Sequence, residues 1–213
     1  MPKTNPQLKF WQGKFGELYL RRNQATSKKV NEGVAAYSRI FRHIKNLESV
    51  LEVGSNIGIQ LTILRHLLGN STKLLAVEPN KTAFDVLNNN KFLKLSKAFN
   101  CDGFDIPLAD NSVDMVFTSG VLIHIAPSNL AKITREIVRI SKRYVLCIEF
   151  FSHEPEEKAY RGHRNVFFKR DFGSFYLDHF QKLKIIDYGF FWQREFSNFM
   201  DYTWWLFEKK TTS

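Results

Sequence analysis

The stretch LEVGSNIGIQL, from Leu51 to Leu61, links a short apolar run to a helical pattern through two glycines. The run at 49–53 predicts a strand, and apolar residues then recur at helical spacing as far as Leu68. Glycine lets the backbone approach a ligand closely, and the first turn of a helix offers free N–H groups. A strand, a glycine turn and a helix in this order predict a nucleotide-type binding site.

Two common ligands of such turns do not fit these residues. The dinucleotide fingerprint requires glycine at its middle position, where this chain has Asn56, whose side chain would crowd a pyrophosphate. A phosphate-binding P-loop requires a Gly-Lys-Ser/Thr sequence, which does not follow the turn. Another nucleotide-like cofactor is therefore favoured.

The rest of the chain continues the alternation of strand and helix patterns. Near-continuous apolar strands between amphipathic helices are typical of a parallel sheet covered on both faces. The last two strands are close enough in sequence to form an antiparallel hairpin. The sequence predicts an α/β fold with a seven-stranded, mostly parallel sheet, one antiparallel strand and helices on both faces. Beyond 49–53, the predicted strands are 73–78, 95–100, 113–118, 143–150, 183–191 and 201–209, and the predicted helices include 128–141 and 169–180.

A single structural unit is predicted for 46–213, preceded by a helical extension at 1–45. The extension carries Trp11 and Tyr19 among other aromatic residues, followed by Arg22. It is interpreted either as a lid that closes over a ligand and excludes water, or as an aromatic helix packed permanently on the sheet.

Composition narrows the class of protein. The 213 residues carry a formal net charge of +10, which suits nucleic acid, an anionic small molecule or an acidic partner. No apolar run approaches the roughly 18 residues that span a bilayer, and the first residues lack a signal-peptide pattern, so a cytoplasmic protein is expected. Cys101 and Cys147 are too far apart in sequence to form a metal-ligand pair, and no metal is predicted.

The glycine turn resembles the first motif of class I S-adenosylmethionine-dependent methyltransferases, which have a Rossmann-like fold. Downstream, Glu78 ends the second predicted strand, 24 residues after Gly54, where an acid can accept hydrogen bonds from both ribose hydroxyls. In the family, an acid after the third strand contacts the adenine amine, which here is Asp102, and the end of the fourth strand lies beneath the methionine. The resemblance implies S-adenosylmethionine as cofactor, bound by Glu52, Gly54, Asn56, Gly58, Glu78, Asp102, Ser119 and Gly120, with Tyr19 and Arg22 from the extension.

Motifs spread from residue 10 to residue 209 resemble the pseudaminic acid biosynthesis-associated methylase family. They are FWQGKFGELYLRRN near the start, FTSGVLIHI, YRGH (160–163), FFKRDF (167–172), DYGF (187–190) and TWWLFEK (203–209). The resemblance implies methyl transfer to a modified nonulosonic sugar or its precursor. The chain departs from the family pattern at 151–153 and 192–195, positions expected to face the acceptor, so the acceptor and the methylated atom stay open.

Candidate catalytic and acceptor-binding residues follow from the same motifs. His124 and His163 are candidate general bases because histidine titrates near neutral pH, although His124 on an apolar background also suits a structural role. An anionic acceptor is predicted to contact Tyr160, Arg161, His163, Lys169 and Arg170, because arginine grips a carboxylate through two hydrogen bonds. The alternative is that Lys169 and Arg170 form a solvated helix start beside Asp171.

Two other functions are compatible with the sequence. A nucleic-acid methyltransferase would use the net charge, but TSGV after the fourth predicted strand differs from the Asn/Asp-Pro-Pro-aromatic loop of many base-amine methyltransferases. A protein that keeps the fold as a non-catalytic, cofactor-binding scaffold is the third hypothesis, against which the intact set of Glu52, Gly54, Gly58 and Glu78 argues.

Overall fold

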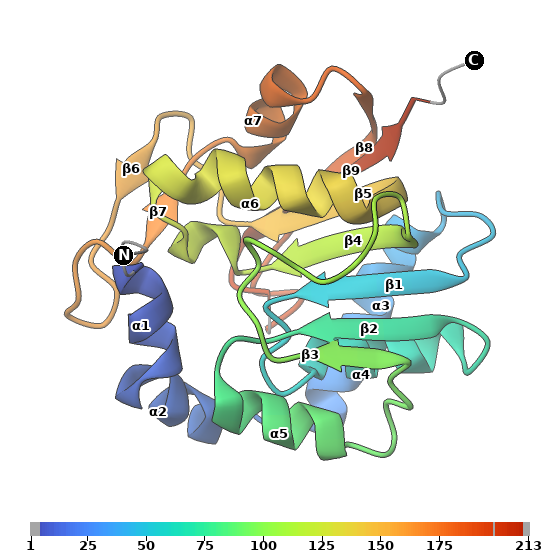
Figure 1. The fold of residues 1–213 in the computed structure, drawn as a ribbon, viewed down its shortest axis with the longest axis horizontal. Coiled ribbons are helices and arrows are strands. Elements are labelled where there is room, and N and C mark those ends of the chain that lie inside the picture. The colour runs from blue at the N-terminus through green and yellow to red at the C-terminus, as the bar shows by residue number, and fades with distance from the viewer. Residues whose placement is uncertain (1–4, 198, 211–213) are drawn as a thin grey trace.

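A seven-stranded sheet forms the centre of the protein, whose computed structural model describes residues 5–197 and 199–210 (Figure 1). Strand order is β3-β2-β1-β4-β5-β9-β8, and β9 runs antiparallel to both of its neighbours. All other adjacent pairs are parallel. The strands of the sheet are β1 (Ser49–Val53), β2 (Lys73–Val77), β3 (Lys97–Phe99), β4 (Val113–Ser119), β5 (Ser141–Glu149), β8 (Leu183–Phe191) and β9 (Tyr202–Lys209).

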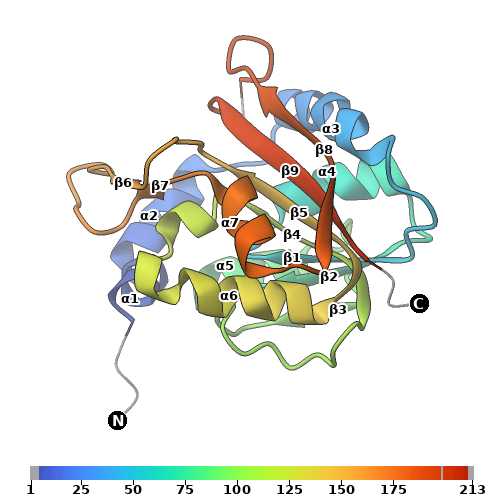
Figure 2. The ribbon, with the colours of Figure 1, turned by 90° about the horizontal axis from the view of Figure 1, so that it is seen from above.

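Helices cover both faces of the sheet, as the view from above makes clear (Figure 2). A short antiparallel pair, β6 (Glu156–Glu157) and β7 (Phe168–Lys169), lies apart from the main sheet. The helices are α1 (Pro6–Gln12), α2 (Lys14–Arg22), α3 (Ser27–Phe41), α4 (Ile59–Leu68), α5 (Lys81–Asn89), α6 (Pro127–Ile140) and α7 (Phe172–His179), with the 3-10 helix η1 at Leu122–His124.

Each face of the sheet has its own apolar core. On one face, α6 and α7 pack on the sheet, and the helical stripe of α6 that begins at Leu130 and ends at Ile140 is buried. On the other face, α3, α4 and α5 contribute Tyr37, Leu61 and Leu87, which have no exposed surface. Because strands β1 and β2 are buried from both sides, their sequences are apolar without alternation.

The fold prediction is confirmed in sheet size, strand direction and helical cover. Element bounds differ by one to three residues from those expected, as at the helix predicted for 128–141 and the strand predicted for 143–150. Within the extension predicted at 1–45, α3 packs on α4 and buries Ala36, Tyr37 and Ile40 in the core. Only α1 and α2 lie over the edge where the parallel strands end (Figure 1).

Candidate active site

The turn after β1 is held by backbone hydrogen bonds to the neighbouring strand. The amides of Gly54 and Ser55 donate to the carbonyl of Val77, at 2.8 and 3.0 Å. Gly54 has a φ of +81°, and a Cβ there would lie 2.6 Å from Cγ2 of Val121. Glycine is therefore required both by backbone conformation and by the close approach of the segment after β4.

Gly58 has a different role from Gly54. It also has a φ of +81°, but a Cβ there would meet the side chains of Leu87 and Leu93 in the core. Gly58 begins α4 and lies outside the cavity wall, whereas Gly54 and Asn56 line the cavity. The second glycine thus serves helix packing, a distinction that the spacing of the motif does not reveal.

A cavity of about 370 Å³ opens at the carboxyl ends of β1, β2 and β4. Its volume falls within the range typical of small-molecule sites, about 300–1,000 Å³. Eight of the ten residues predicted to bind the cofactor line it, namely Tyr19, Glu52, Gly54, Asn56, Glu78, Asp102, Ser119 and Gly120. Gly58 and Arg22 do not line it; Arg22 is exposed, with its guanidinium 5.9 Å from the centroid of the Phe15 ring.

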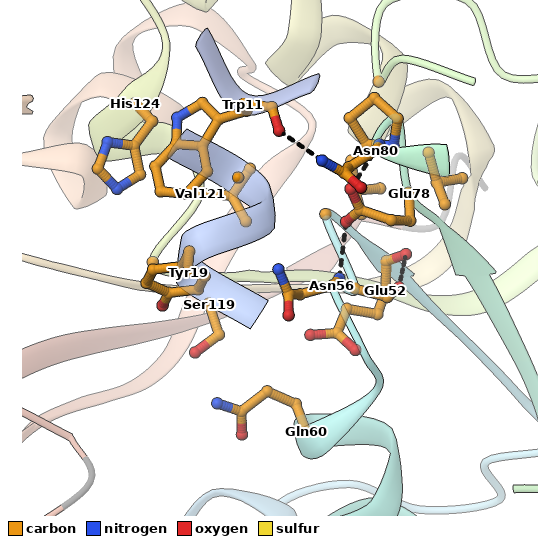
Figure 3. Close-up of a pocket in the computed structure, with 18 of the residues that line it drawn as sticks. Trp11, Tyr19, Glu52, Asn56, Gln60, Glu78, Asn80, Ser119, Val121 and His124 are labelled. Atoms are coloured by element: carbon orange, nitrogen blue, oxygen red, sulfur yellow. Dashed lines mark hydrogen bonds between the residues drawn. The ribbon is translucent and has the colours of Figure 1, made fainter. Parts of the chain in front are cut away.

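Glu78 is fixed by two backbone donors. The amide of Asn56 donates to its Oε2 and the amide of Asn80 to its Oε1, both at 2.7 Å (Figure 3). Burial raises the pKa of this carboxyl to about 7, while the two amides act in the opposite direction. Each oxygen keeps a further lone pair, so the side chain can still accept hydrogen bonds from a ligand.

Glu52 lies beside Glu78 but is not satisfied in the same way. It is almost fully buried, and its Oε2 has no hydrogen-bond partner in the described part of the chain. Burial, and then the nearby Glu78, raise the pKa of Glu52 well above its ordinary range. An unpartnered buried carboxyl on a cavity wall is suited to a ligand that carries hydrogen-bond donors or positive charge.

The cavity has two ends of different character, which Figure 3 separates. At one end, the side chains of Glu52, Asn56, Gln60 and Ser119 gather, and Tyr19 lies next to them. In the part of the chain that the structure describes, neither Oε1 of Gln60 nor Oγ of Ser119 has a hydrogen-bond partner, although both are buried. Trp11 and His124 lie at the opposite end.

Helices α1 and α2 form a roof over the cavity. The carbonyl of Trp11 accepts a 2.8 Å hydrogen bond from the side chain of Asn80, and Gln12 donates to the carbonyl of Pro79 at 3.2 Å. On the far side, Gln7 donates to the carbonyl of Asn165 at 2.9 Å. Hydrogen bonds therefore tie α1 both to the segment after β2 and to the segment before β7.

His124 is held in a buried, neutral state. Its Nδ1 lies 2.6 Å from the carbonyl oxygen of Val166, which can only accept, so Nδ1 carries the proton and Nε2 keeps its lone pair. Burial lowers its pKa to about 4. The ring centroid of Trp11 lies 4.5 Å away. His124 lines the cavity, but this pKa makes it a weak base, and its main contacts are structural.

The residues predicted to bind the acceptor lie outside this cavity. His163 packs against Phe10 and Phe15, with ring centroids 4.9 and 5.5 Å apart, and Tyr160 packs near His124. Arg161 is exposed at a φ of +50°. Lys169 and Arg170 border a second cavity of about 180 Å³ next to β6 and β7. The structure does not bring these five residues together around the turn after β1.

Asp102 and Asp171 both have local hydrogen bonds. Oδ1 of Asp102 accepts a hydrogen bond from the amide of Phe104 at 3.0 Å, and Asp102 lines the cavity. Asp171 accepts from the amide of Ser174 and caps α7, which is the structural alternative considered for it.

Glu149 supports the wall of the cavity, and the sequence motifs did not identify it. It ends β5 with no exposed surface, and it accepts hydrogen bonds from the amides of Val121, Leu122 and Ile123 at 3.1, 2.9 and 3.4 Å. Burial raises its pKa to about 7. It thereby holds the segment that packs on Gly54. An acid within the apolar run YVLCIEFF was the available signal.

Comparison with known proteins agrees with this architecture. Residues 51–148 match a family model described as a methyltransferase domain. The fold is similar to a SAM dependent methyltransferase from Aquifex aeolicus, with 17% identity, a TM-score of 0.66, and 90% of this chain and 97% of that chain covered. It is also similar to a SAM-dependent methyltransferase from Leishmania major, with 14% identity, a TM-score of 0.71, and coverage of 97% and 87%.

A third similar structure is the 1,6-didemethyltoxoflavin-N1-methyltransferase of Burkholderia thailandensis, solved with 1,6-didemethyltoxoflavin and S-adenosylhomocysteine. It shares 12% identity at a TM-score of 0.68, with 99% of this chain and 93% of that chain covered. No curated protein matches the sequence significantly. At these identities the solved structures establish the fold, and the matched domain establishes the class of activity.

The strand order, the glycine turn after β1 and the matched domain define the class I methyltransferases. The protein is an S-adenosylmethionine-dependent methyltransferase. In the described part of the chain, no helix is long and apolar enough to cross a membrane.

Proposed function

We propose that this enzyme transfers a methyl group from S-adenosylmethionine to an oxygen or nitrogen atom of a small anionic acceptor, a nonulosonic, pseudaminic-type sugar or its precursor. The observation that carries the cofactor part is the pair of buried carboxyls, Glu52 and Glu78, on the wall of one cavity. The acceptor part draws its support from the motifs at 160–163, 167–172 and 187–190.

The lining residues fit the cofactor. The ribose hydroxyls would donate to Glu78, whose carboxyl is held by the amides on either side of it. The ammonium of the methionine would meet the unpartnered Oε2 of Glu52, and this positive charge would favour the ionised form of the Glu52 carboxyl. The adenine would lie near Asp102, beside the apolar side chains of Phe104 and Ile133.

When bound, the cofactor supplies an electrophilic methyl group, and the protein's task is to position the acceptor and exclude water. The roof of α1 and α2 excludes water, while the hydrogen bonds of Asn80 and Gln7 hold it down. A proton must leave a hydroxyl acceptor, whereas a neutral amine needs no base before attack. Because the pKa of His124 is about 4, we assign it a structural and packing role at neutral pH.

Calorimetric titration with S-adenosylmethionine tests the proposal. Glu78→Ala should weaken binding by about 30-fold or more, because losing two ribose hydrogen bonds costs roughly 2 kcal/mol. Glu78→Gln keeps the size of the side chain and should give a smaller loss. The matched control is Asp85→Ala, which removes an exposed carboxylate on α5 and should leave affinity unchanged. No binding to the wild type would refute the proposal.

Activity assays with different acceptors then test the identity of the methyl acceptor. Methylation of a nonulosonic acid or its nucleotide-activated form, measured by the release of S-adenosylhomocysteine, would support the proposed acceptor. Methylation of RNA instead, with a steep dependence on salt, would replace a sugar with a nucleic acid as the acceptor. A cytoplasmic location stays a prediction, and fractionation of cells that express the protein would test it.

A further inference from the structure

The main cavity extends beyond the residues assigned to the cofactor. Its lining also includes Gln60 and Ile63 of α4, Phe199 and Met200 of the β8–β9 loop, and Tyr202, which begins β9. We call this part, defined by these five residues, the α4–β9 pocket. None of these five residues is assigned to the cofactor, so this part of the cavity is left for a second ligand.

The α4–β9 pocket combines apolar walls with few polar atoms. Met200 and Phe199 supply apolar surface, while Oε1 of Gln60 and Oγ of Ser119 are buried without a hydrogen-bond partner among the described residues. Figure 3 shows both side chains at the same end of the cavity. An amide oxygen accepts hydrogen bonds, so Gln60 is suited to a hydroxyl or amine of a ligand. Lys29 also lines this cavity and places a cation at its edge.

The loop that forms one wall is held in place by contacts to α3. Ser197 donates to Glu32 at 2.8 Å, and Arg39 forms an ion pair with Glu195. The guanidinium of Arg39 also lies 4.7 Å from the ring centroid of Phe196. Within the loop, the amide of Gln193 donates to Asp201 at 2.8 Å. A wall with this many contacts is preorganised for binding.

We propose that the α4–β9 pocket binds the methyl acceptor, with Gln60 accepting a hydrogen bond from the nucleophilic hydroxyl or amine and Met200 packing on its carbon skeleton. The inference rests on the proposed function, because the pocket is defined as the part of the cavity that is not assigned to the cofactor. The acceptor class is a small molecule with one apolar side and one O–H or N–H group.

This assignment differs from the acceptor site predicted from the sequence. Lys169 and Arg170 border the second cavity, whose lining also contains Glu156 and Glu157, so their positive charge is offset there. Lys169 lies over the rings of Phe150 and Phe167. The sequence did indicate the new site in one respect. The chain departs from the family pattern at 192–195, and these residues begin the β8–β9 loop that supplies Phe199 and Met200.

A cofactor analogue tests the pocket without knowledge of the acceptor. In the S-benzyl analogue, a benzyl group replaces the transferred methyl and projects from the sulfur toward the place of the acceptor. Wild type should bind it within tenfold of S-adenosylmethionine, as measured by calorimetry. Met200→Trp should fill the pocket and weaken the analogue at least tenfold, while the affinity for S-adenosylmethionine changes less than twofold and so reports an intact fold.

The controls separate the possible failures. Met200→Leu keeps the volume of the side chain, and Lys169→Ala and Arg170→Ala alter the second cavity; all three should bind the analogue as wild type does. If Met200→Trp binds both ligands like wild type, or if wild type binds the analogue more than 100-fold more weakly than S-adenosylmethionine, the pocket assignment is wrong. If wild type does not bind S-adenosylmethionine, the proposed function itself fails.

Discussion

The proposed cofactor end and the proposed acceptor end of the cavity are built by different means. At the cofactor end, functional groups sit at the carboxyl ends of adjacent parallel strands, and backbone amides hold them, as in Glu78. At the acceptor end, side chains from α4 meet a loop whose position depends on side-chain contacts to α3. The first arrangement follows from the fold, whereas the second can vary while the fold stays the same.

Gly54→Ala should cause the largest loss of cofactor affinity, because position 54 has no space for a side chain. The new Cβ would lie 2.6 Å from Val121, and a φ of +81° is strained for alanine. Affinity for S-adenosylmethionine should fall at least 100-fold, or roughly 3 kcal/mol or more, in calorimetric titration.

Adding Val121→Ala to Gly54→Ala separates the two causes. Removing the methyl groups of Val121 relieves the overlap but not the backbone strain, so affinity should recover in part. Full recovery would show that strain contributes nothing, and no recovery would show that Val121 is not the limiting contact.

Glu149→Gln should change the pH dependence of stability. The pKa of Glu149 is about 7 in the folded protein against an ordinary value of 4.5, so the folded state binds the proton more tightly than the unfolded state. Its contribution is fully present below pH 4.5 and is lost as the pH rises to about 7, at a cost of about 3 kcal/mol. The free energy of unfolding of the variant, relative to wild type, should therefore rise by about this amount between pH 4.5 and 8.

Urea unfolding at several pH values provides the measurement, and Glu136→Gln provides a control of opposite sign. Arg139 lowers the pKa of Glu136, so ionised Glu136 stabilises the fold above its ordinary titration range and less so as the pH falls. The relative stability of Glu136→Gln should thus decrease with rising pH. A parallel response of the two variants would contradict the assigned pKa shifts.

Most of the residues predicted for the cofactor line one cavity, whereas those predicted for the acceptor do not, and the reason is physical. Glu52, Gly54 and Glu78 follow buried strands, whose order in a parallel sheet brings their ends together. Gly58 shows the limit, because spacing alone cannot tell a glycine beside a ligand from one packed against Leu87. Glu149 was missed because its partners are amides of a segment nearly thirty residues away.

At the acceptor end, sequence motifs marked residues without giving their positions. His163 and Tyr160 lie in a polar motif, yet they pack under the roof with Phe10, Phe15 and Trp11. Whether those contacts bear on the acceptor depends on how a loop of irregular structure folds, which local patterns do not determine.

Trp11→Ala tests whether the roof contributes to holding the cofactor. Its ring contacts His124, Phe15 and Tyr19, and its removal should loosen α1 and α2 over the cavity. The dissociation rate of S-adenosylmethionine in stopped-flow experiments should increase about tenfold, consistent with a loss of about 1.4 kcal/mol. Leu18→Ala, which shortens an exposed apolar side chain of α2, is the control. An unchanged rate would show that the roof is not a barrier to release.

Arg39→Ala should have the smallest effect and should act on the acceptor end alone. The ion pair with Glu195 is partly exposed, and such pairs are worth about 0.2–1 kcal/mol, so the β8–β9 loop should loosen without losing its fold. Affinity for the S-benzyl analogue should drop two- to fivefold, while affinity for S-adenosylmethionine stays the same. Equal losses for both ligands would mean that the loop also supports the cofactor end. The two ends of the cavity would then not differ in how they are held.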